Sequence, residues 1–250
     1  MDKSRVSVGR LWVNCVEKHN FNALVFVAVV FVSLLLFYTA YDKESKTLVW
    51  QKLFGVLLFS DFSKSLSEFN KIFALSAIGL ISFSLIAGPL SKMFPKHFAH
   101  YLPMRKFVGL SGFAFALAHS IYSLVIIYKL DFGKMFFSNT NILGIVSAII
   151  AVVIFLLMSI TSTRTAVQKM GYHNWKLLQT TGYAALFFSI LHFVLLETKP
   201  GKGLDVRPFG LLFLALEIIA LAIRAGTAII RTKPRTGFEE HVGEKPQKIV

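Results

Sequence analysis

The sequence predicts an all-α integral membrane protein, a bundle of six transmembrane helices, and three observations support this fold class. Hydrophobic residues make up 55% of the 250 positions and charged residues only 16%, whereas a soluble domain of this length carries more charge. Hydrophobic segments fill the chain from about residue 21 to residue 230 and leave no room for a separate catalytic domain. The single cysteine, Cys15, excludes an intramolecular disulfide, a CxxC redox pair and a thiolate metal cluster.

Six hydrophobic runs have the length of about 20 residues that a helix needs to cross roughly 30 Å of hydrocarbon. They cover residues 21–41, 72–90, 107–128, 142–160, 177–197 and 209–230. The first run follows a basic start but lacks a small-residue cleavage site, so we expect a retained span rather than a signal peptide. Residues 48–60 are apolar but too short to cross and include Lys52, which favours an interfacial or re-entrant helix between the first two spans.

The distribution of lysine and arginine predicts the orientation, with both termini in the cytoplasm. The segments then placed inside hold more of these residues than the two short outer loops; the longer outer segment 42–71, with five lysines and four acids, weakens the contrast. We expect residues 1–20 to form a basic cytoplasmic N-terminus, 21–230 the membrane domain and 231–250, polar with two prolines, a flexible cytoplasmic tail. The net charge of +14 is then a signal for topology and anionic lipid rather than for nucleic acid.

Two of the seven histidines, His119 and His192, fall inside the predicted spans, where ionisable residues are rare and are functional candidates. The third and fifth spans run in the same direction. The two histidines lie roughly 18 and 23 Å along them at 1.5 Å per residue, at similar depth in the outer half of the bilayer. Two imidazoles that face each other at one level are what six-coordinate haem iron requires. The alternative is a structural pair, each neutral ring bonded to a neighbouring helix.

Small residues precede both histidines at the same offsets of three, seven and ten positions. They are Ala116, Gly112 and Gly109 before His119, and Ser189, Ala185 and Gly182 before His192. These offsets stay within one stripe of a helix, on the side of the histidine. The stripes would leave room for a flat macrocycle between the helices; the alternative is ordinary packing of helices through small residues.

Three segments carry a family resemblance: "FALSAIGLISFSLIAGPLSKM", "MRKFVGLSGFAFALAHSIYSL" and "TSTRTAVQKMGYHNWKLLQTTGYAALFFSILHFVLLE". Their distinguishing features are Pro89-Leu90, Arg105-Lys106, Gly109-Leu110, His119 with Tyr122, Thr161-Ser162, Trp175, and Tyr183 ahead of His192. Residues 72–197 thereby resemble the ferric reductase-like transmembrane domain family, most closely its haem subunits of periplasmic methionine sulfoxide reductase systems. The resemblance implies a b-type haem with His119 and His192 as axial ligands, six helices and electron transfer across a bacterial inner membrane.

One departure from the family bears on the number of haems. The family usually has a histidine thirteen residues before the second ligand, where this chain has Gln179. Relatives with two haems also have a histidine thirteen or fourteen residues before the first ligand, where this chain has Lys106 and Arg105. These residues are poor iron ligands, so we expect one haem, near the outer face. His100 and His173, each nineteen residues before its intramembrane partner, offer an alternative inner site. Pro103, which is expected to break the helix beyond His100, argues against it.

The chain contains no GxGxxG motif and no soluble flavin or nicotinamide module, so its electrons must come from elsewhere. A quinol within the bilayer suits an outer haem, and a cytosolic flavin reductase would need a further carrier such as FMN near the inner face. By analogy the acceptor is a periplasmic molybdenum-containing methionine sulfoxide reductase. The chain would then be an electron-transfer subunit without catalytic residues of its own. Two alternatives stay open: a ferric or oxygen reductase working with a separate flavoprotein, and a non-redox membrane protein such as a transporter or assembly factor.

The remaining charged positions are less informative. Glu217 and Arg224 share a face of the sixth span but are too far apart for direct contact, and Arg224 is interpreted as a snorkelling residue. In the last outer loop, Lys199, Lys202 and Arg207 are expected to serve topology, with steering of an anionic partner or binding of a haem propionate as alternatives.

Overall fold

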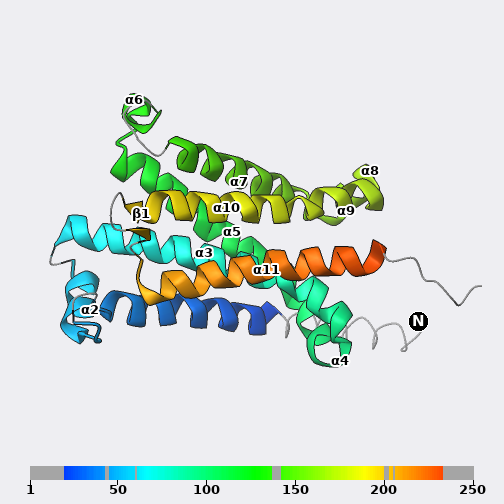
Figure 1. Ribbon diagram of the computed structural model, residues 1–250, viewed down its shortest axis with the longest axis horizontal. Coiled ribbons are helices and arrows are strands. Elements are labelled where there is room, and N and C mark those ends of the chain that lie inside the picture. The colour runs from blue at the N-terminus through cyan, green and yellow to red at the C-terminus, as the bar shows by residue number, and fades with distance from the viewer. Residues whose placement is uncertain are drawn as a thin grey trace, which may run out of the picture.

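The computed structural model describes residues 20–42, 45–59, 61–136, 142–199, 203–204 and 206–232. Six helices in it are long and apolar enough to cross a bilayer, and they lie side by side in an elongated bundle (Figure 1). They are Asn20–Tyr38, Lys64–Met93, Pro95–Ile127, Ile142–Ile160, Tyr172–Glu197 and Pro208–Thr227. The prediction of an all-α bundle of six spans is confirmed. The basic N-terminus and nearly all of the predicted tail lie outside the described residues.

The bundle is built from the following elements. The first half of the chain holds η1 (Leu34–Tyr38), α2 (Trp50–Leu57), α3 (Phe62–Met93), α4 (Pro95–Phe98), η2 (Ala99–Met104), α5 (Arg105–Tyr122) and η3 (Ser123–Ile127). The second half holds α6 (Phe132–Phe136), α7 (Ile142–Ile160), α8 (Arg164–Met170), α9 (Tyr172–Thr180), α10 (Gly182–Glu197), β1 (Thr198–Lys199), β2 (Gly203–Leu204) and α11 (Pro208–Thr232). The two short strands pair with each other in antiparallel fashion.

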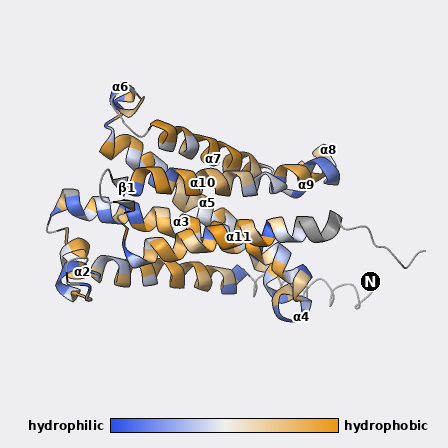
Figure 2. Cartoon of the chain, viewed as in Figure 1, coloured by the Kyte–Doolittle hydropathy of each residue, from blue (hydrophilic) through white to orange (hydrophobic). Residues whose placement is uncertain are grey.

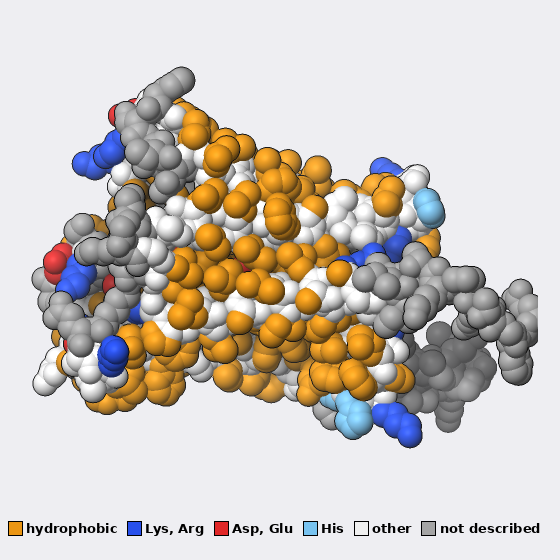
Figure 3. Space-filling model, in the orientation of Figure 1, with side chains coloured by type: hydrophobic (Ala, Val, Ile, Leu, Met, Phe, Trp, Pro, Cys, Tyr) orange, Lys and Arg blue, Asp and Glu red, His pale blue; other side chains and the backbone are white. Residues whose placement is uncertain are grey.

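Charged and polar residues gather at the two ends of the bundle, and apolar residues cover its middle (Figures 2 and 3). One end, called the α2 end below, carries α2, α6 and β1; the other, called the α4 end, carries α4, α8 and α9. Large apolar side chains such as Leu143, Ile160 and Leu212 are exposed on the outside. In water this surface would be costly, so its natural surroundings are lipid tails.

Two helix boundaries differ from simple hydropathy. Helix α3 begins at Phe62, ten residues before the predicted span, because the Asp61 side chain accepts a hydrogen bond from the Lys64 backbone N–H and caps a polar first part of the helix. The α-helix is interrupted at Pro103, as expected. Proline cannot donate the backbone hydrogen bond of a helix interior, and the chain there forms the 3₁₀ helix η2 before α5 starts at Arg105.

Residues 48–60 contain the short helix α2, which buries Leu53 and Val56 and exposes Phe54 and Leu57. This two-sided character supports the predicted interfacial helix, although its position at a membrane surface stays a prediction. Lys52 forms an ion pair with Asp42, and hydrogen bonds from Lys52 and Ser45 hold the pKa of the Asp42 carboxyl well below its ordinary value.

The helices pack mainly as two close pairs. α5 lies along α3, α10 lies along α7, and α11 packs on the α3 side, whereas α5 does not pack closely along α10. One buried cluster joins five of these helices through Leu85 of α3, Phe113 of α5, Phe155 of α7, Leu186 of α10 and Ala220 of α11. The two helices that carry the intramembrane histidines are therefore held in place by different partners.

Gly112 shows how close the α3–α5 contact is. A Cβ atom at Gly112 would lie 2.9 Å from Ile81 Cγ1 and 3.0 Å from the Ile81 backbone nitrogen, so the neighbouring helix would have to move. We expect Gly112→Ala to destabilise the protein by about 1–3 kcal/mol, the usual cost of overpacking. Gly226→Ala on α11 is the matched control, since nothing lies within 4 Å of its added Cβ. Thermal unfolding in detergent should show a lowered Tm for the first variant only, and equal values would contradict this packing.

Candidate functional site

The structure brings the two intramembrane histidines together. The ring centroids of His119 on α5 and His192 on α10 are 6.4 Å apart, with their planes at 70°. The two helices run in the same direction, from the α4 end toward the α2 end (Figure 1). The two rings therefore lie next to each other on helices that run in parallel, as expected; their role as haem ligands stays a prediction.

Each imidazole is oriented by a hydrogen bond to a backbone carbonyl of a different helix. His119 Nδ1 lies 3.1 Å from the carbonyl oxygen of Asn70, and His192 Nδ1 lies 2.9 Å from that of Gly144. A carbonyl oxygen can only accept, so each Nδ1 carries a proton and donates it. In the neutral ring, Nε2 then has a free lone pair, which is the tautomer required of a metal ligand. Within the described part of the chain, neither Nε2 has a hydrogen-bond partner.

Local features place these two carbonyls within reach. Gly144 has no side chain, and a Cβ there would lie 3.3 Å from Leu195 Cβ, so glycine allows α10 to approach α7 closely enough for the His192 bond. Asn70 is buried on α3, and its Nδ2 donates to Ser123 Oγ at 3.0 Å, at the point where α5 changes into the π-helix η3. The carbonyl that holds His119 is thus tied to the helix that carries His119.

The small residues before the two histidines lie against neighbouring helices. Cβ atoms at Gly109 and Gly182 would lie 2.7 Å from Ser84 Oγ of α3 and from Met158 Cε of α7, respectively. Gly112 contacts α3, Ala185 is fully buried in the central cluster, and Ala116 is half-buried. The stripes therefore bring α5 close to α3 and α10 close to α7. Their predicted role in lining a haem pocket stays a prediction.

Glu217 is the residue whose importance the sequence reasoning missed. It is fully buried on α11, and its Oε1 accepts a hydrogen bond of 2.9 Å from Ser189 Oγ, one turn before His192 on α10. Its other oxygen has no partner among the described residues. The available signal was a single acidic residue inside an apolar run, since an intramembrane carboxylate is costly and is usually functional.

The positions considered for an inner site have other contacts. Gln179 Nε2 donates to the Met158 carbonyl at 3.3 Å, and His100 stacks on Tyr101. His100 belongs to η2, which packs on α3, α4 and α5, whereas His173 belongs to α9, which packs on α8 and α10. No group of three or more His, Cys, Asp and Glu side chains able to hold a metal ion occurs in the described part of the chain.

Arg207 forms a cluster at the α2 end. Its guanidinium makes a two-point ion pair with Glu68, donates to the Tyr38 carbonyl at 3.0 Å and lies 4.4 Å above the Tyr38 ring. Arg207 therefore makes its contacts within the protein. The alternative that it binds a haem propionate is not needed to explain its position. Lys202 lies outside the described residues.

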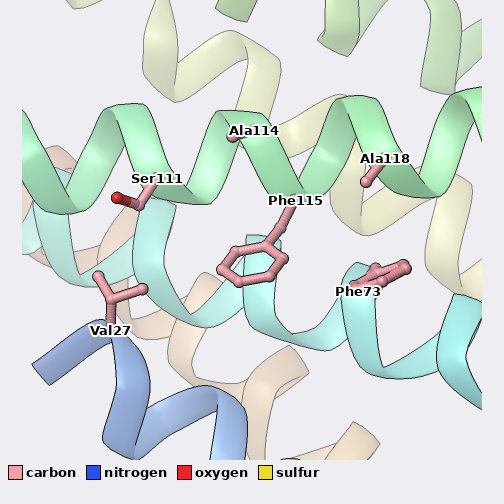
Figure 4. A pocket seen from close by; sticks show the side chains of 6 residues that line it. All are labelled: Val27, Phe73, Ser111, Ala114, Phe115 and Ala118. Carbon is pink, nitrogen blue, oxygen red and sulfur yellow. The ribbon is translucent and has the colours of Figure 1, made fainter. Parts of the chain in front are cut away.

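A groove of about 360 Å³ lies between the first span, α3 and α5 (Figure 4). Its walls are apolar apart from one serine; the lining residues are Val27, Phe73, Ser111, Ala114, Phe115 and Ala118. Because it contains no titratable side chain, the histidine pair remains the candidate site.

The fold and the site define the class of this protein: a multi-pass membrane protein with two facing intramembrane histidines. Residues 73–190, a segment that includes His119, match the ferric reductase like transmembrane component family; His192 follows two positions after this segment. The chain is also similar to the protein-methionine-sulfoxide reductase heme-binding subunit MsrQ of Rhodospirillum rubrum. The two are 25% identical over 172 residues, which cover 69% of this chain and 76% of that relative. The resemblance drawn from the sequence motifs is confirmed.

Proposed function

We propose that this protein binds one b-type haem between His119 and His192 and carries electrons across a bacterial inner membrane. Its donor is a quinol or a flavin, and its acceptor is a periplasmic reductase of the methionine sulfoxide reductase type. The observation that carries the proposal is the pair of facing imidazoles, each with Nδ1 bonded to a carbonyl. The similarity to a heme-binding subunit of a methionine sulfoxide reductase supports the same conclusion.

The residues present fit a haem. Imidazole nitrogens bind first-row metal ions at about 2 Å, and a ring centroid lies about 1 Å farther, so two rings on opposite sides of one iron have centroids about 6 Å apart. The observed separation is 6.4 Å. Two protein donors alone do not complete the coordination of a metal ion, whereas a porphyrin supplies the four remaining nitrogens. Both histidines are only half-buried, so neighbouring side chains leave part of each ring free.

The chain's own residues would orient the ligands and exclude water. The carbonyls of Asn70 and Gly144 fix each ring and raise the basicity of its Nε2 through the bond to Nδ1–H. The central apolar cluster, which includes Leu85, Phe113 and Leu186, lowers the polarity around the site and thereby contributes to its redox potential. The bound haem would supply the one-electron couple between ferric and ferrous iron.

The arrangement supports a single haem and an orientation. Gln179 stands where the family usually has an inner ligand, and its side chain is bonded to the Met158 carbonyl, which supports a single haem. The α4 end, with its loops rich in lysine and arginine, is assigned to the cytoplasm, and residues 21–230 form one membrane domain. The haem site then lies toward the outer face, near a periplasmic acceptor.

The first test is a reduced-minus-oxidised absorption spectrum with a haem assay on protein purified from cells that supply haem. We expect a b-type spectrum and about one haem per chain. Protein without haem would contradict the proposal and would favour a structural role for both histidines in the packing of the helices. Two haems per chain would contradict the single site and direct attention to His100 and His173.

The partners need a separate measurement. Protein reduced with a quinol or with a flavin reductase should lose its ferrous spectrum when the oxidised periplasmic reductase is added. Rapid reoxidation by ferric chelates or oxygen, with no response to the reductase, would instead favour a ferric or oxygen reductase.

A further inference from the structure

Two arginines from different helices converge on one tyrosine in the half of the bundle toward the α4 end. Arg224 of α11 places its Cζ 5.3 Å from the centre of the Tyr183 ring of α10. Arg105, the first residue of α5, places its guanidinium against Gly88 of α3, three residues after Leu85, whose carbonyl accepts the hydrogen bond of the Tyr183 hydroxyl. Both arginines are half-buried.

The surroundings hold these groups in place. The Tyr183 hydroxyl donates to the Leu85 carbonyl of α3 at 2.9 Å, and Ser84 Oγ donates to the Arg105 carbonyl at 2.9 Å. The Arg105 guanidinium lies against Gly88 of α3: a Cβ at Gly88 would be 2.8 Å from Nη1. Four helices, α3, α5, α10 and α11, therefore build one site around the two guanidiniums.

The positive charge of this site has no balancing carboxylate among the described residues. Arg207, by contrast, is paired with Glu68 at the α2 end. A partly buried guanidinium without an opposing carboxylate is unfavourable, because its charge has lost part of its hydration. The Tyr183 hydroxyl is neutral and already donates its proton to Leu85, so it does not neutralise them. Snorkelling alone would let each arginine reach water separately rather than turn toward a shared tyrosine.

We propose that Arg105 and Arg224 bind a phosphate group beside Tyr183. The planar guanidinium matches phosphate oxygens with two parallel hydrogen bonds, and two such groups would neutralise its charge. The source is either the headgroup of an anionic phospholipid or free phosphate. The site is separate from the histidine pair, so the inference stands whether or not the chain binds haem.

The test measures thermal unfolding of the purified full-length protein in detergent, with phosphatidylglycerol, phosphatidylcholine or inorganic phosphate added. A ligand at roughly a hundredfold excess over its Kd should raise the Tm of the unaltered protein by about 5–10 °C. We expect this increase with phosphatidylglycerol and its loss in Arg105→Gln and Arg224→Gln. Lys106→Gln, which removes the same charge from the exposed neighbouring position, should keep the increase. An equal increase with inorganic phosphate would identify free phosphate as the source.

Several results would overturn the proposal. The first is an unaltered protein whose Tm does not change when any of the anions is added. This measurement does not depend on the folding of a variant. Another is an equal loss of the increase in Lys106→Gln, which would show a general effect of surface charge. Gly88→Ala keeps both charges but displaces the Arg105 guanidinium, so full retention of the increase in this variant would also contradict the site.

Discussion

Protein carrying His119→Ala or His192→Ala is expected to lose its haem. Each ring would supply one ligand through Nε2, and the hydrogen-bond partners of the two rings among the described residues, the carbonyls of Asn70 and Gly144, cannot replace an imidazole. Loss of an outer-shell partner already lowers metal affinity about 10–100-fold, and loss of the ligand itself should cost at least as much. The haem content per chain and the reduced-minus-oxidised spectrum measure the effect.

Matched controls separate this result from general damage to the fold. His100→Ala and His173→Ala also remove an imidazole, but from outside the pair, and should keep the spectrum. Added imidazole should partly restore the spectrum of the two pair variants by occupying the space left by the side chain. If His100→Ala lost haem as fully as His119→Ala, the assignment of the ligands would be wrong. Retention of full haem by one pair variant would indicate a five-coordinate site.

The second large effect is expected from Glu68→Ala. The Glu68 and Arg207 side chains are only 11% and 16% exposed, and the carboxylate accepts from both Nη atoms of the guanidinium. Removing one partner leaves a buried charge unpaired, which costs about 3–5 kcal/mol. For a chain of this length that corresponds to a Tm lower by roughly 6–20 °C.

The double variant Glu68→Leu with Arg207→Leu tests the cause, since replacing both charges by apolar groups is often nearly neutral. It should recover most of the lost Tm. Asp42→Ala is the control at the same end of the bundle: it removes the partner of Lys52, whose side chain is 45% exposed and can be solvated by water, and it should change the Tm little. An effect of Glu68→Ala no larger than that of Asp42→Ala would show that the buried pair does not stabilise the protein.

Hydropathy located all six spans, because length and apolar composition decide what can cross a bilayer. Hydropathy placed the start of the second span at residue 72, whereas the helix begins at Phe62. The polar residues at the beginning of α3 are helical for another reason, the cap at Asp61, and this signal was readable in the sequence. The depth of His119 and His192 followed from counting residues along two parallel helices, and the ring separation of 6.4 Å agrees with it.

The surroundings of the histidines could not be predicted in the same way. A stripe of small residues shows which side chains share a face of a helix, but not which neighbour that face contacts; Gly109 and Gly112 contact α3. The Nδ1 partners are backbone carbonyls, which every residue has and which leave no mark in a sequence. The hydrogen bond of Glu217 to Ser189 joins positions 28 residues apart and depends on how α10 and α11 pack.

The Arg207 cluster has a consequence for the biogenesis of the protein. Arg207 stands at the entrance of the last span, 139 residues after Glu68 and 169 after Tyr38, in the second and first spans. At a synthesis rate of about 5–20 residues per second, Glu68 leaves the ribosome roughly 7–28 s before its partner exists. During that interval the early spans hold a carboxylate that lacks its partner guanidinium, and an unpaired charge is costly once it is buried. Arrival of the sixth span removes it, so this ion pair requires that the first two spans and the sixth have assembled.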